Sequence, residues 1–405
     1  MSVTAYLEVA EGDTLGTLQR FLGQLLTADI VDALLVPQKL PTGDNVVPTL
    51  IRDPAKLAGV DPIAPVMPVI AAQAVSNVTA TEHGERLAAV LRSCELRAVI
   101  ELVKLQQASL EDVILIGVDC LGTYEVRDYA GLIEAGVDPT AEMLAVAAEG
   151  QLDLLAADSE SAAKGYQIRA ACRMCEKPIP GGPDVYHPDI IIGLLGVDPN
   201  KQILIEASDT LAEKLGLEAA EGPSAGRRGE PVEPSGQVPA RRKEIIERLI
   251  AERTTERDRV FAAFRERVTG MDGLLAEFST CIRCYNCMGA CPICYCKECI
   301  FRTPTFDHAS PQYFRWAERK GSIRLPTDTL LFHLTRLNHM ATSCVGCGMC
   351  ESACPSELPV ALIFRAVGQE TQAIFDYHPG RSLEEEVPVS TFREDELTQL
   401  GKRQE

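Results

Sequence analysis

Apolar residues in the amino-terminal part of the chain switch between helical and strand-like spacing. From Thr14 to Asp29 they recur every three or four residues, which predicts a helix, and the apolar run Val31 to Val36 follows as a buried strand. A second strand is predicted at Arg86 to Leu91, followed by a helix that Ser93 can cap. Because Asp112 to Val118 returns as a strand, this part of the chain predicts a βαβ unit in a parallel sheet.

Two cysteines flank the predicted strands. Cys94 falls in the first turn of the helix, and Cys120 falls just beyond the second strand of the βαβ unit. The carboxyl ends of parallel strands meet at one edge of a sheet, where open α/β sheets bind their ligands, so we expect both side chains at that edge. Two further strands and a helix are predicted at Ile190 to Leu195, Gln202 to Glu206 and Thr210 to Leu217.

Changes in periodicity and composition divide the chain into five expected parts. Gly, Pro, Ser and Arg dominate one stretch without periodicity, and a charged helix with an apolar stripe follows it. The parts are an α/β domain over 1–220, a linker over 221–240, a connecting helix over 241–270, a mainly helical cysteine-rich domain over 271–367 and an acidic arm over 368–405.

Charge and composition narrow the class of protein. The 405 residues carry a formal net charge of −19, which argues against a nucleic-acid or anionic-membrane binder. No apolar run approaches the ~18–20 residues that a membrane span needs. The start of the chain lacks a basic n-region and an apolar h-region, so we expect no secretory signal and a cytoplasmic protein.

The cysteine content points to metal ligation. Of the fifteen cysteines, eleven fall between residues 281 and 354. A reducing compartment does not support a disulfide framework, so thiolate ligands of a metal are the first interpretation.

Two cysteine runs in this region share the spacing of bacterial ferredoxins. In each run three cysteines recur at every third position, and a fourth cysteine followed by proline comes four residues later. At this spacing three thiolates bind one [4Fe-4S] cluster while the fourth reaches the other cluster. The predicted ligand sets are Cys281, Cys284, Cys287 and Cys354 for one cluster, and Cys344, Cys347, Cys350 and Cys291 for the second.

A structural zinc domain is the alternative for these runs, because Cys-x-x-Cys pairs also bind zinc. Zinc sites seldom repeat the full run of four cysteines and a proline, so the spacing favours clusters. The 52 residues between the runs contain Trp316 and two helix-like stretches. This part therefore resembles the larger, helical kind of two-cluster ferredoxin.

Three more cysteines follow the first run directly. Zinc is one possibility for Cys294, Cys296 and Cys299, with a histidine as the fourth ligand. Buried free thiols that shield the clusters are the other, because free cysteine is among the most buried residue types. The histidines available to complete a zinc site are His308, His333 and His339.

Motifs in the amino-terminal part carry a family resemblance. The stretches 87–98, 116–122, 171–175 and 188–193 resemble successive motifs of the beta subunits of deazaflavin-coenzyme-reducing hydrogenases and formate dehydrogenases. The resemblance covers roughly residues 10 to 215. It implies FAD beside one more [4Fe-4S] cluster, with Cys94, Cys120, Cys172 and Cys175 as ligands. One departure is that Arg92 and Ser93 precede Cys94, where the family usually has a Gly/Pro-Cys motif.

Flavin contacts are harder to assign, because the chain has no Gly-x-Gly-x-x-Gly fingerprint. The polar residues after the apolar run Val66 to Val75 and a glycine near the predicted cluster are the candidates; a capped turn is the alternative explanation for the polar ones. The residues are Ser76, Asn77, Thr79 and Gly117. His83 and His187 are candidate proton donors, although lone histidines are more often ordinary surface or core residues. No catalytic residue is assigned.

Together these features predict an iron–sulfur flavoprotein that serves as the electron-transfer beta subunit of a formate dehydrogenase or hydrogenase-like complex. A flavin takes up a hydride and releases electrons singly, which matches one-electron clusters. The expected partners are a catalytic or bifurcating redox subunit and a soluble carrier such as the deazaflavin coenzyme, a nicotinamide or ferredoxin. Formate or hydrogen chemistry would belong to another subunit, since no residues for a molybdenum, tungsten or nickel centre are recognised.

Two other functions fit parts of the same pattern. One is a free-standing ferredoxin-dependent flavin reductase that acts on its own small-molecule substrate. The other is a structural iron–sulfur or zinc scaffold without flavin. A stable hetero-oligomer favours the electron-transfer subunit, and the absence of a flavin absorbance band favours the scaffold.

Overall fold

The computed structural model describes residues 2–81, 84–149, 161, 164–219, 238–321 and 327–388, and these form two compact units. Unit 1 runs to Arg259 and includes His378–Glu385, whereas unit 2 comprises Val260–Tyr377 and residues 386–388. The predicted linker, 221–240, falls almost entirely outside the described residues, as does His83. No described helix is long and apolar enough to cross a membrane.

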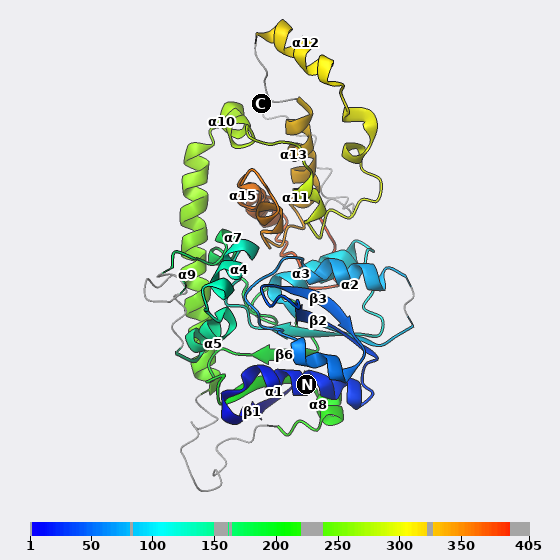
Figure 1. Cartoon of the computed structure of the whole chain (residues 1–405), viewed down its shortest axis with the longest axis vertical. Coiled ribbons are helices and arrows are strands. Elements are labelled where there is room, and N and C mark those ends of the chain that lie inside the picture. Colours follow the sequence, from blue (N-terminus) through cyan, green and yellow to red (C-terminus); the bar gives the residue numbers. More distant parts are fainter. Residues whose placement is uncertain are drawn as a thin grey trace, which may run out of the picture. The chain divides into compact units, whose positions relative to one another are not determined.

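Unit 1 is built on one seven-stranded sheet (Figure 1). Its strands are β1 Ser2–Glu8, β2 Ala33–Lys39, β3 Val46–Ile51, β4 Leu87–Arg92, β5 Val113–Val118, β6 Ile190–Gly193 and β7 Gln202–Ser208, in the spatial order β1-β7-β6-β5-β4-β2-β3. The four strands β2, β4, β5 and β6 are parallel, and β1, β3 and β7 are each antiparallel to their neighbours. The predicted α/β class is therefore confirmed.

The helices of unit 1 connect these strands. They are α1 Thr14–Thr27, α2 Ala71–Thr79, α3 Ser93–Lys104, α4 Val126–Glu134, α5 Pro139–Glu149, α7 Ala170–Arg173 and α8 Asp209–Leu215, with short 3-10 helices η1 Ala10–Gly12 and η2 Pro54–Gly59. The predicted βαβ unit is present as β4, α3 and β5, with Leu87 beside Val113 and Arg92 beside Val118.

The start of α3 differs from the sequence prediction. Ser93 is the first helical residue, and Arg92 occupies the N-cap position. The Glu95 carboxylate accepts from the Arg92 backbone N–H at 3.0 Å, while the Ser93 hydroxyl donates to the Lys177 carbonyl at 2.6 Å. Ser93 is therefore not the cap, because its hydroxyl instead ties the strand end to a distant segment.

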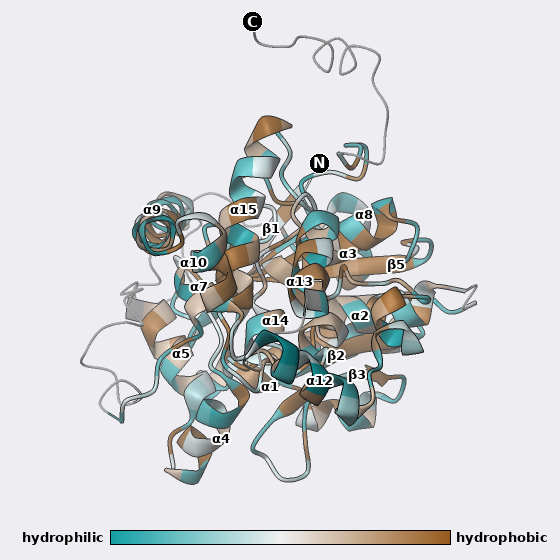
Figure 2. Cartoon of the chain, turned by 90° about the horizontal axis from the view of Figure 1, so that it is seen from above, coloured by the Kyte–Doolittle hydropathy of each residue, from teal (hydrophilic) through white to brown (hydrophobic). Residues whose placement is uncertain are grey.

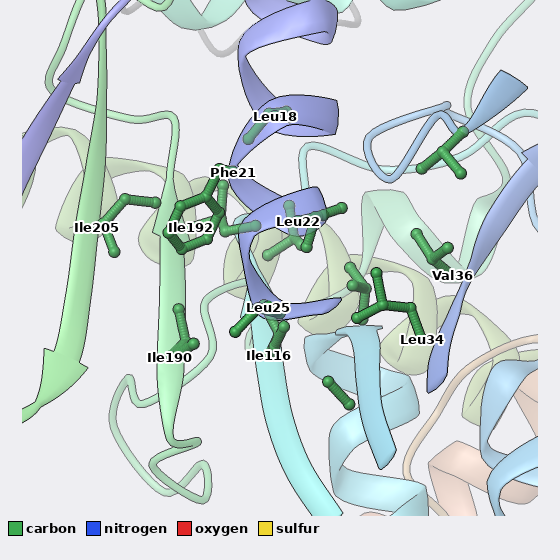
Figure 3. Packing of buried hydrophobic residues seen from close by; sticks show 14 of the residues in the cluster. Leu18, Phe21, Leu22, Leu25, Leu34, Val36, Ile116, Ile190, Ile192 and Ile205 are labelled. Carbon is green, nitrogen blue, oxygen red and sulfur yellow. The ribbon is translucent and has the colours of Figure 1, made fainter. Parts of the chain in front are cut away.

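The core of unit 1 lies between α1 and the sheet (Figure 3). Apolar residues at helical spacing on α1, such as Leu18 and Leu22, meet the alternating inward residues of the central strands, such as Ile116 and Ile192. Leu18, Leu22 and Ile116 are fully buried. This packing fixes β5, and with it the carboxyl edge at which Cys120 lies.

The predicted charged helix is α9, which spans Val238–Arg267. Its first part belongs to unit 1, where Ile245 and Leu249 are buried in an apolar cluster, and its last turns belong to unit 2, where Phe261 and Phe264 are buried. The buried stripe therefore follows the predicted spacing. Arg242 on this helix pairs with the buried Asp119 carboxylate, its Nη2 lying 2.9 Å from Oδ1.

Unit 2 is helical, as predicted for the cysteine-rich part (Figure 1). Its elements besides the end of α9 are α10 Gly270–Glu277, α11 Asn286–Gly289, η3 Ile300–Arg302, η4 Pro304–Phe306, α12 Ser310–Lys320, α13 Thr327–Met340, α14 Met349–Ser352 and α15 Val360–Ile374. The insertion between the two cysteine runs supplies α12 and α13, which are the two helix-like stretches of the sequence. Figure 2 shows α12 as largely hydrophilic, in contrast to the apolar β5 of unit 1.

The predicted acidic arm begins later than residue 368. The helix α15 continues through Gly368 to Ile374. Gly368 packs closely in this helix, since an added Cβ would lie 3.0 Å from the Ala341 carbonyl oxygen. Beyond the helix, Gly380 belongs to unit 1, and its N–H donates to the Glu101 carboxylate at 2.9 Å. Residues 389–405 of the predicted arm lie outside the described residues.

Candidate metal centres

The first ferredoxin-type set lines one pocket of unit 2. Cys281, Cys284, Cys287 and Cys354 all contribute to it. The remaining wall is mainly apolar and includes Phe332 and Leu358. Cys354 comes from the second cysteine run, so the pocket gathers the three leading cysteines of one run and the last cysteine of the other. This is the grouping expected from exchanged ligands.

The second set lines a separate pocket with the reciprocal composition. Cys344, Cys347 and Cys350 come from the second run, and Cys291 comes from the first. The short helices α11 and α14 carry the third cysteine of each run, Cys287 and Cys350.

The backbone of the two runs curls in the same way. Gly346 and Gly348 have φ values of +71° and +77° in the second run. The matching positions of the first run are Arg283 and Tyr285, which have φ values of +59° and +62° despite carrying side chains. Residues other than glycine rarely adopt a positive φ, so contacts around the first loop must stabilise this backbone conformation. One such contact is the ion pair of Arg283 with Asp328 at 2.6 Å.

The donor atoms of both pockets fit iron–sulfur clusters. Four sulfur donors within a largely apolar wall are the ligand type that [4Fe-4S] clusters require. Among the described residues, no three His, Cys, Asp or Glu side chains converge closely enough to bind a single metal ion.

Burial opposes ionisation of the free thiols in these pockets. It raises the pKa of Cys287 to about 11, an effect that the Arg336 guanidinium partly offsets. Burial likewise raises the pKa of Cys350 well above its usual value. Ligation requires the thiolate, so cluster binding has to supply the positive charge that holds these groups deprotonated.

His333 lies against the first pocket rather than near the unassigned cysteines. Its ring stacks on Phe278, and its Nε2 lies 3.4 Å from Cys281 Sγ. Burial, with a smaller contribution from Arg336, lowers the pKa of His333 to about 4, so the imidazole is neutral near pH 7. A neutral ring can donate a hydrogen bond to a thiolate from one nitrogen.

The three cysteines after the first run, Cys294, Cys296 and Cys299, do not line either of the two cysteine pockets. Cys296 is exposed, whereas Cys294 and Cys299 pack against the apolar cluster around Phe332. Of the histidines considered as a fourth zinc ligand, His308 packs edge-on against Trp316 and His339 is exposed. Zinc at this triplet therefore stays a prediction, and the packing of Cys294 and Cys299 favours the alternative of buried thiols.

The amino-terminal cysteines gather at the carboxyl edge of the sheet. Cys94 lies in the first turn of α3, Cys120 lies two residues beyond β5, and Cys172 and Cys175 lie on and just after α7. Cys120 interacts electrostatically with Cys172 and Cys175, and Arg92 interacts with both Cys94 and Cys120. The structure thus brings together four thiols that are scattered over 82 residues of sequence.

Three arginines surround this group with positive charge. Arg92 is buried and donates to the Val66 carbonyl at 3.1 Å, while Arg253 donates to the Leu121 carbonyl at 2.5 Å. Arg169 donates through Nη2 to Cys172 Sγ at 3.7 Å and through Nε to the Thr123 hydroxyl. Positive charge at this position would stabilise the negative charge of a thiolate-ligated cluster.

These charges act differently on the individual thiols. Burial raises the pKa of Cys120 to about 11, and the neighbouring Cys172 adds to the rise. Burial also opposes ionisation of Cys172, but Arg169 and the Thr123 hydroxyl outweigh it and lower the pKa of that thiol. Cys172 is therefore more readily ionised than Cys120.

A pocket opens beside Cys120 at the ends of β5 and β6. Arg92, Asp119 and Cys120 line it together with apolar residues such as Pro62 and Met143. This edge is where open parallel sheets bind ligands. The pocket is thus a candidate space for part of a small organic group next to Cys120.

The polar residues nominated for flavin contact lie elsewhere in the fold. Ser76, Asn77 and Thr79 lie within α2, not in the capped turn considered as the alternative. The Ser76 hydroxyl donates to the Gln107 carbonyl at 2.7 Å, and the buried Thr79 hydroxyl donates to the Val75 carbonyl at 2.9 Å. Both hydroxyls thus donate to carbonyl groups of the protein itself. A role of Ser76, Asn77 and Thr79 in flavin binding stays a prediction.

Gly117 has a packing role that predicts a stability effect. A Cβ at this position would lie 2.5 Å from Pro180 Cβ and 2.9 Å from Pro188 Cγ, so Gly117→Ala should lower the free energy of unfolding by about 1–3 kcal/mol. Denaturant unfolding measures this change. The control is Gly59→Ala, whose added methyl meets Gln38 at an ordinary 3.5 Å. Equal stabilities of the two variants would contradict the packing role.

His187, the described histidine among the proposed proton donors, is about half exposed. Its Nδ1 lies 3.0 Å from the Pro188 carbonyl, and its Nε2 lies 3.3 Å from the Glu206 carboxylate. These contacts fit an ordinary surface histidine.

Sequence reasoning missed the arginines around the thiols. Arg92 directly follows the apolar run Leu87 to Leu91, which is a signal of burial, whereas Arg336 has polar neighbours such as Thr335 and Asn338 and carries no such signal. Their partners lie far along the chain, so spacing alone cannot identify which cysteines they approach.

Comparisons with known proteins agree with this arrangement. Residues 277–358 match the family described as the 4Fe-4S dicluster domain. Two pockets of four cysteines in that region, together with the match, define an iron–sulfur protein.

Relatives that cover most of the chain narrow the class further. The F420-dependent formate dehydrogenase subunit beta of Methanocaldococcus jannaschii is 26% identical over 378 residues, which cover 90% of this chain and 91% of the relative. The F420-dependent formate dehydrogenase 1 subunit beta of Methanococcus maripaludis is 25% identical over 93% of both chains. These relatives confirm the predicted resemblance to beta subunits of deazaflavin-dependent enzymes.

A solved structure gives a more distant similarity. A chain of the F420-reducing [NiFe] hydrogenase complex from Methanosarcina barkeri aligns with a TM-score of 0.42 and 12% identity, covering 67% of this chain and 94% of that chain.

Proposed function

We propose that this chain is the electron-transfer beta subunit of an F420-dependent formate dehydrogenase or of a related hydrogenase-like complex. The observation that carries the proposal is the presence of three cysteine sets in one chain. One set lies at the ligand-binding edge of an α/β sheet, and two lie in a dicluster domain. The names of the full-length relatives support the same role.

The amino-terminal set is proposed to bind a third [4Fe-4S] cluster beside FAD. Cys94, Cys120, Cys172 and Cys175 supply the four thiolates, and the adjoining arginines offset their charge. When bound, FAD supplies the conversion between two-electron hydride chemistry and one-electron transfer. The pocket beside Cys120 is our candidate for the flavin ring system, because it borders both the cysteines and the carboxyl ends of the parallel strands.

The contribution of the protein itself is to hold and insulate these groups. Largely apolar walls around the carboxy-terminal sets limit the access of water, although Cys284 is exposed, and such a surround influences cluster potentials. The buried Asp119, held by Arg242 and by the backbone N–H groups of Leu194 and Leu195, fixes the floor of the amino-terminal pocket. Formate or hydrogen chemistry is assigned to a partner subunit in a hetero-oligomer.

A carrier assay tests the proposed function. The chain, purified without oxygen, should oxidise reduced F420 when a one-electron dye is the acceptor, and acid extraction should release FAD. NADH in place of reduced F420 serves as the matched control and should support a much slower reaction, because the relatives are F420-dependent. A preparation that holds iron and sulfide but neither releases flavin nor reacts with reduced F420 would contradict the proposal.

A further inference from the structure

Arg336 on α13 is a buried cation at the first candidate cluster site. It is only 3% exposed, and its guanidinium donates through Nη1 to Cys287 Sγ at 3.1 Å and through Nη2 to the Cys287 carbonyl at 3.0 Å. Phe332 and Phe364 flank the guanidinium, with ring centroids 5.5 and 5.0 Å from its carbon. The side chain is therefore held in one position by two hydrogen bonds and two aromatic rings.

The same side chain also reaches the second candidate cluster site. Arg336 lines the pocket of Cys291, Cys344, Cys347 and Cys350, although its hydrogen bond goes to a cysteine of the other pocket. Its charge acts on Cys287 of the first set, on Cys291 and Cys350 of the second, and also on Cys294, which belongs to neither set. One guanidinium thus serves both groups of thiols.

Among the described residues, the negatively charged groups that act on this cation are thiols. Within the part of the chain that the structure describes, no carboxylate forms an ion pair with Arg336, and its buried Nε has no hydrogen-bond partner. Burying an unpaired charge is costly, so a buried arginine of this kind requires a negative group nearby. Thiolate-ligated clusters in the two pockets would provide that negative charge.

We propose that Arg336 is a shared electrostatic element that raises the reduction potentials of both carboxy-terminal clusters. The inference rests on the proposed function, because it requires clusters in both pockets. Reduction adds one electron to each cluster, with no proton gained or lost by the arginine, so a fixed positive charge stabilises the reduced form. Its N–H contact with the Cys287 sulfur adds a second effect in the same direction at the first cluster.

The test is a redox titration followed by electron paramagnetic resonance, with dithionite as reductant. In Arg336→Met both carboxy-terminal clusters should become harder to reduce, by about tenfold or more in the equilibrium constant, which corresponds to about 59 mV for one electron. Arg336→Lys keeps the charge but loses the planar fork, so it should restore most of the potential of the second cluster and less of that of the first. Iron and sulfide analysis of each variant establishes that both clusters are present.

A matched control separates local charge from a general effect of losing an arginine. Arg265 is also in unit 2, but it is half exposed and pairs with Glu370 at 2.6 Å. Arg265→Met should leave both potentials at their wild-type values, because solvent screens an exposed ion pair.

The measured potentials either support or overturn the shared role of Arg336. A fall in both potentials in Arg336→Met, or loss of clusters in Arg336→Met with their retention in Arg336→Lys, supports the shared role of the charge. Unchanged potentials, a shift of one cluster alone, or loss of clusters in both variants would overturn it. Wild-type protein without iron in the dicluster region would instead refute the proposed function.

Discussion

Cys175→Ala is expected to interrupt electron transfer from the flavin to the carboxy-terminal clusters. The variant should still lose its flavin absorbance when the hydride donor is added, because that reaction needs only the flavin pocket. Its carboxy-terminal clusters should remain oxidised on the timescale at which the wild-type clusters are reduced, since the proposed function makes the amino-terminal cluster the first one-electron acceptor. Rapid-mixing spectroscopy measures both events in one experiment.

The interpretation requires a folded, flavin-containing variant. Cluster ligation contributes to stability, so flavin content is measured first, and iron should fall by about four per chain. Cys296→Ala is the matched control, because Cys296 is exposed and lies outside all three cysteine sets. Normal reduction of the carboxy-terminal clusters in a flavin-containing Cys175→Ala protein would show that the amino-terminal set is not the link.

Cys354→Ala is expected to damage the cluster built mainly by the first cysteine run. Cys354 shares a pocket with Cys281, Cys284 and Cys287, although more than 60 residues separate it from them in sequence. The variant should therefore perturb the same paramagnetic signal as Cys284→Ala, with a loss of up to about four irons per chain.

Cys347→Ala is the comparison that tests the exchange of ligands. It should perturb the other signal, because Cys347 lines the pocket that also receives Cys291. A Cys354→Ala spectrum that matches Cys347→Ala instead of Cys284→Ala would mean that each run binds its own cluster.

Local spacing was sufficient to predict some of the regular elements, whereas β1, β3, α2, α4 and α5 were not recognised from the sequence. The apolar positions of α1 and the stripe of α9 follow the helical period, and the strands β4 and β5 are short apolar runs, so each can be recognised without its partner. The cysteine runs are equally local in sequence. The placement of Cys120 just beyond β5 followed from the topology of a βαβ unit.

Features that depend on distant partners were not predictable in this way. Ser93 lost its expected capping role because the Lys177 carbonyl, 84 residues away, accepts its hydroxyl. The arm was predicted from residue 368 because periodicity is weak there, whereas α15 continues to Ile374. The position of Arg336 between two cysteine sets depends on how α13 packs, which no spacing rule encodes.

The count of iron, acid-labile sulfide and flavin in protein purified without oxygen tests the central claim most directly. Three [4Fe-4S] clusters and one FAD predict about twelve irons, about twelve sulfides and about one flavin per chain. About eight irons and eight sulfides would show that the chain lacks the proposed amino-terminal cluster, and would thus contradict the proposed link between the flavin and the dicluster region. Zinc as the main metal would contradict the assignment of both ferredoxin-type cysteine sets.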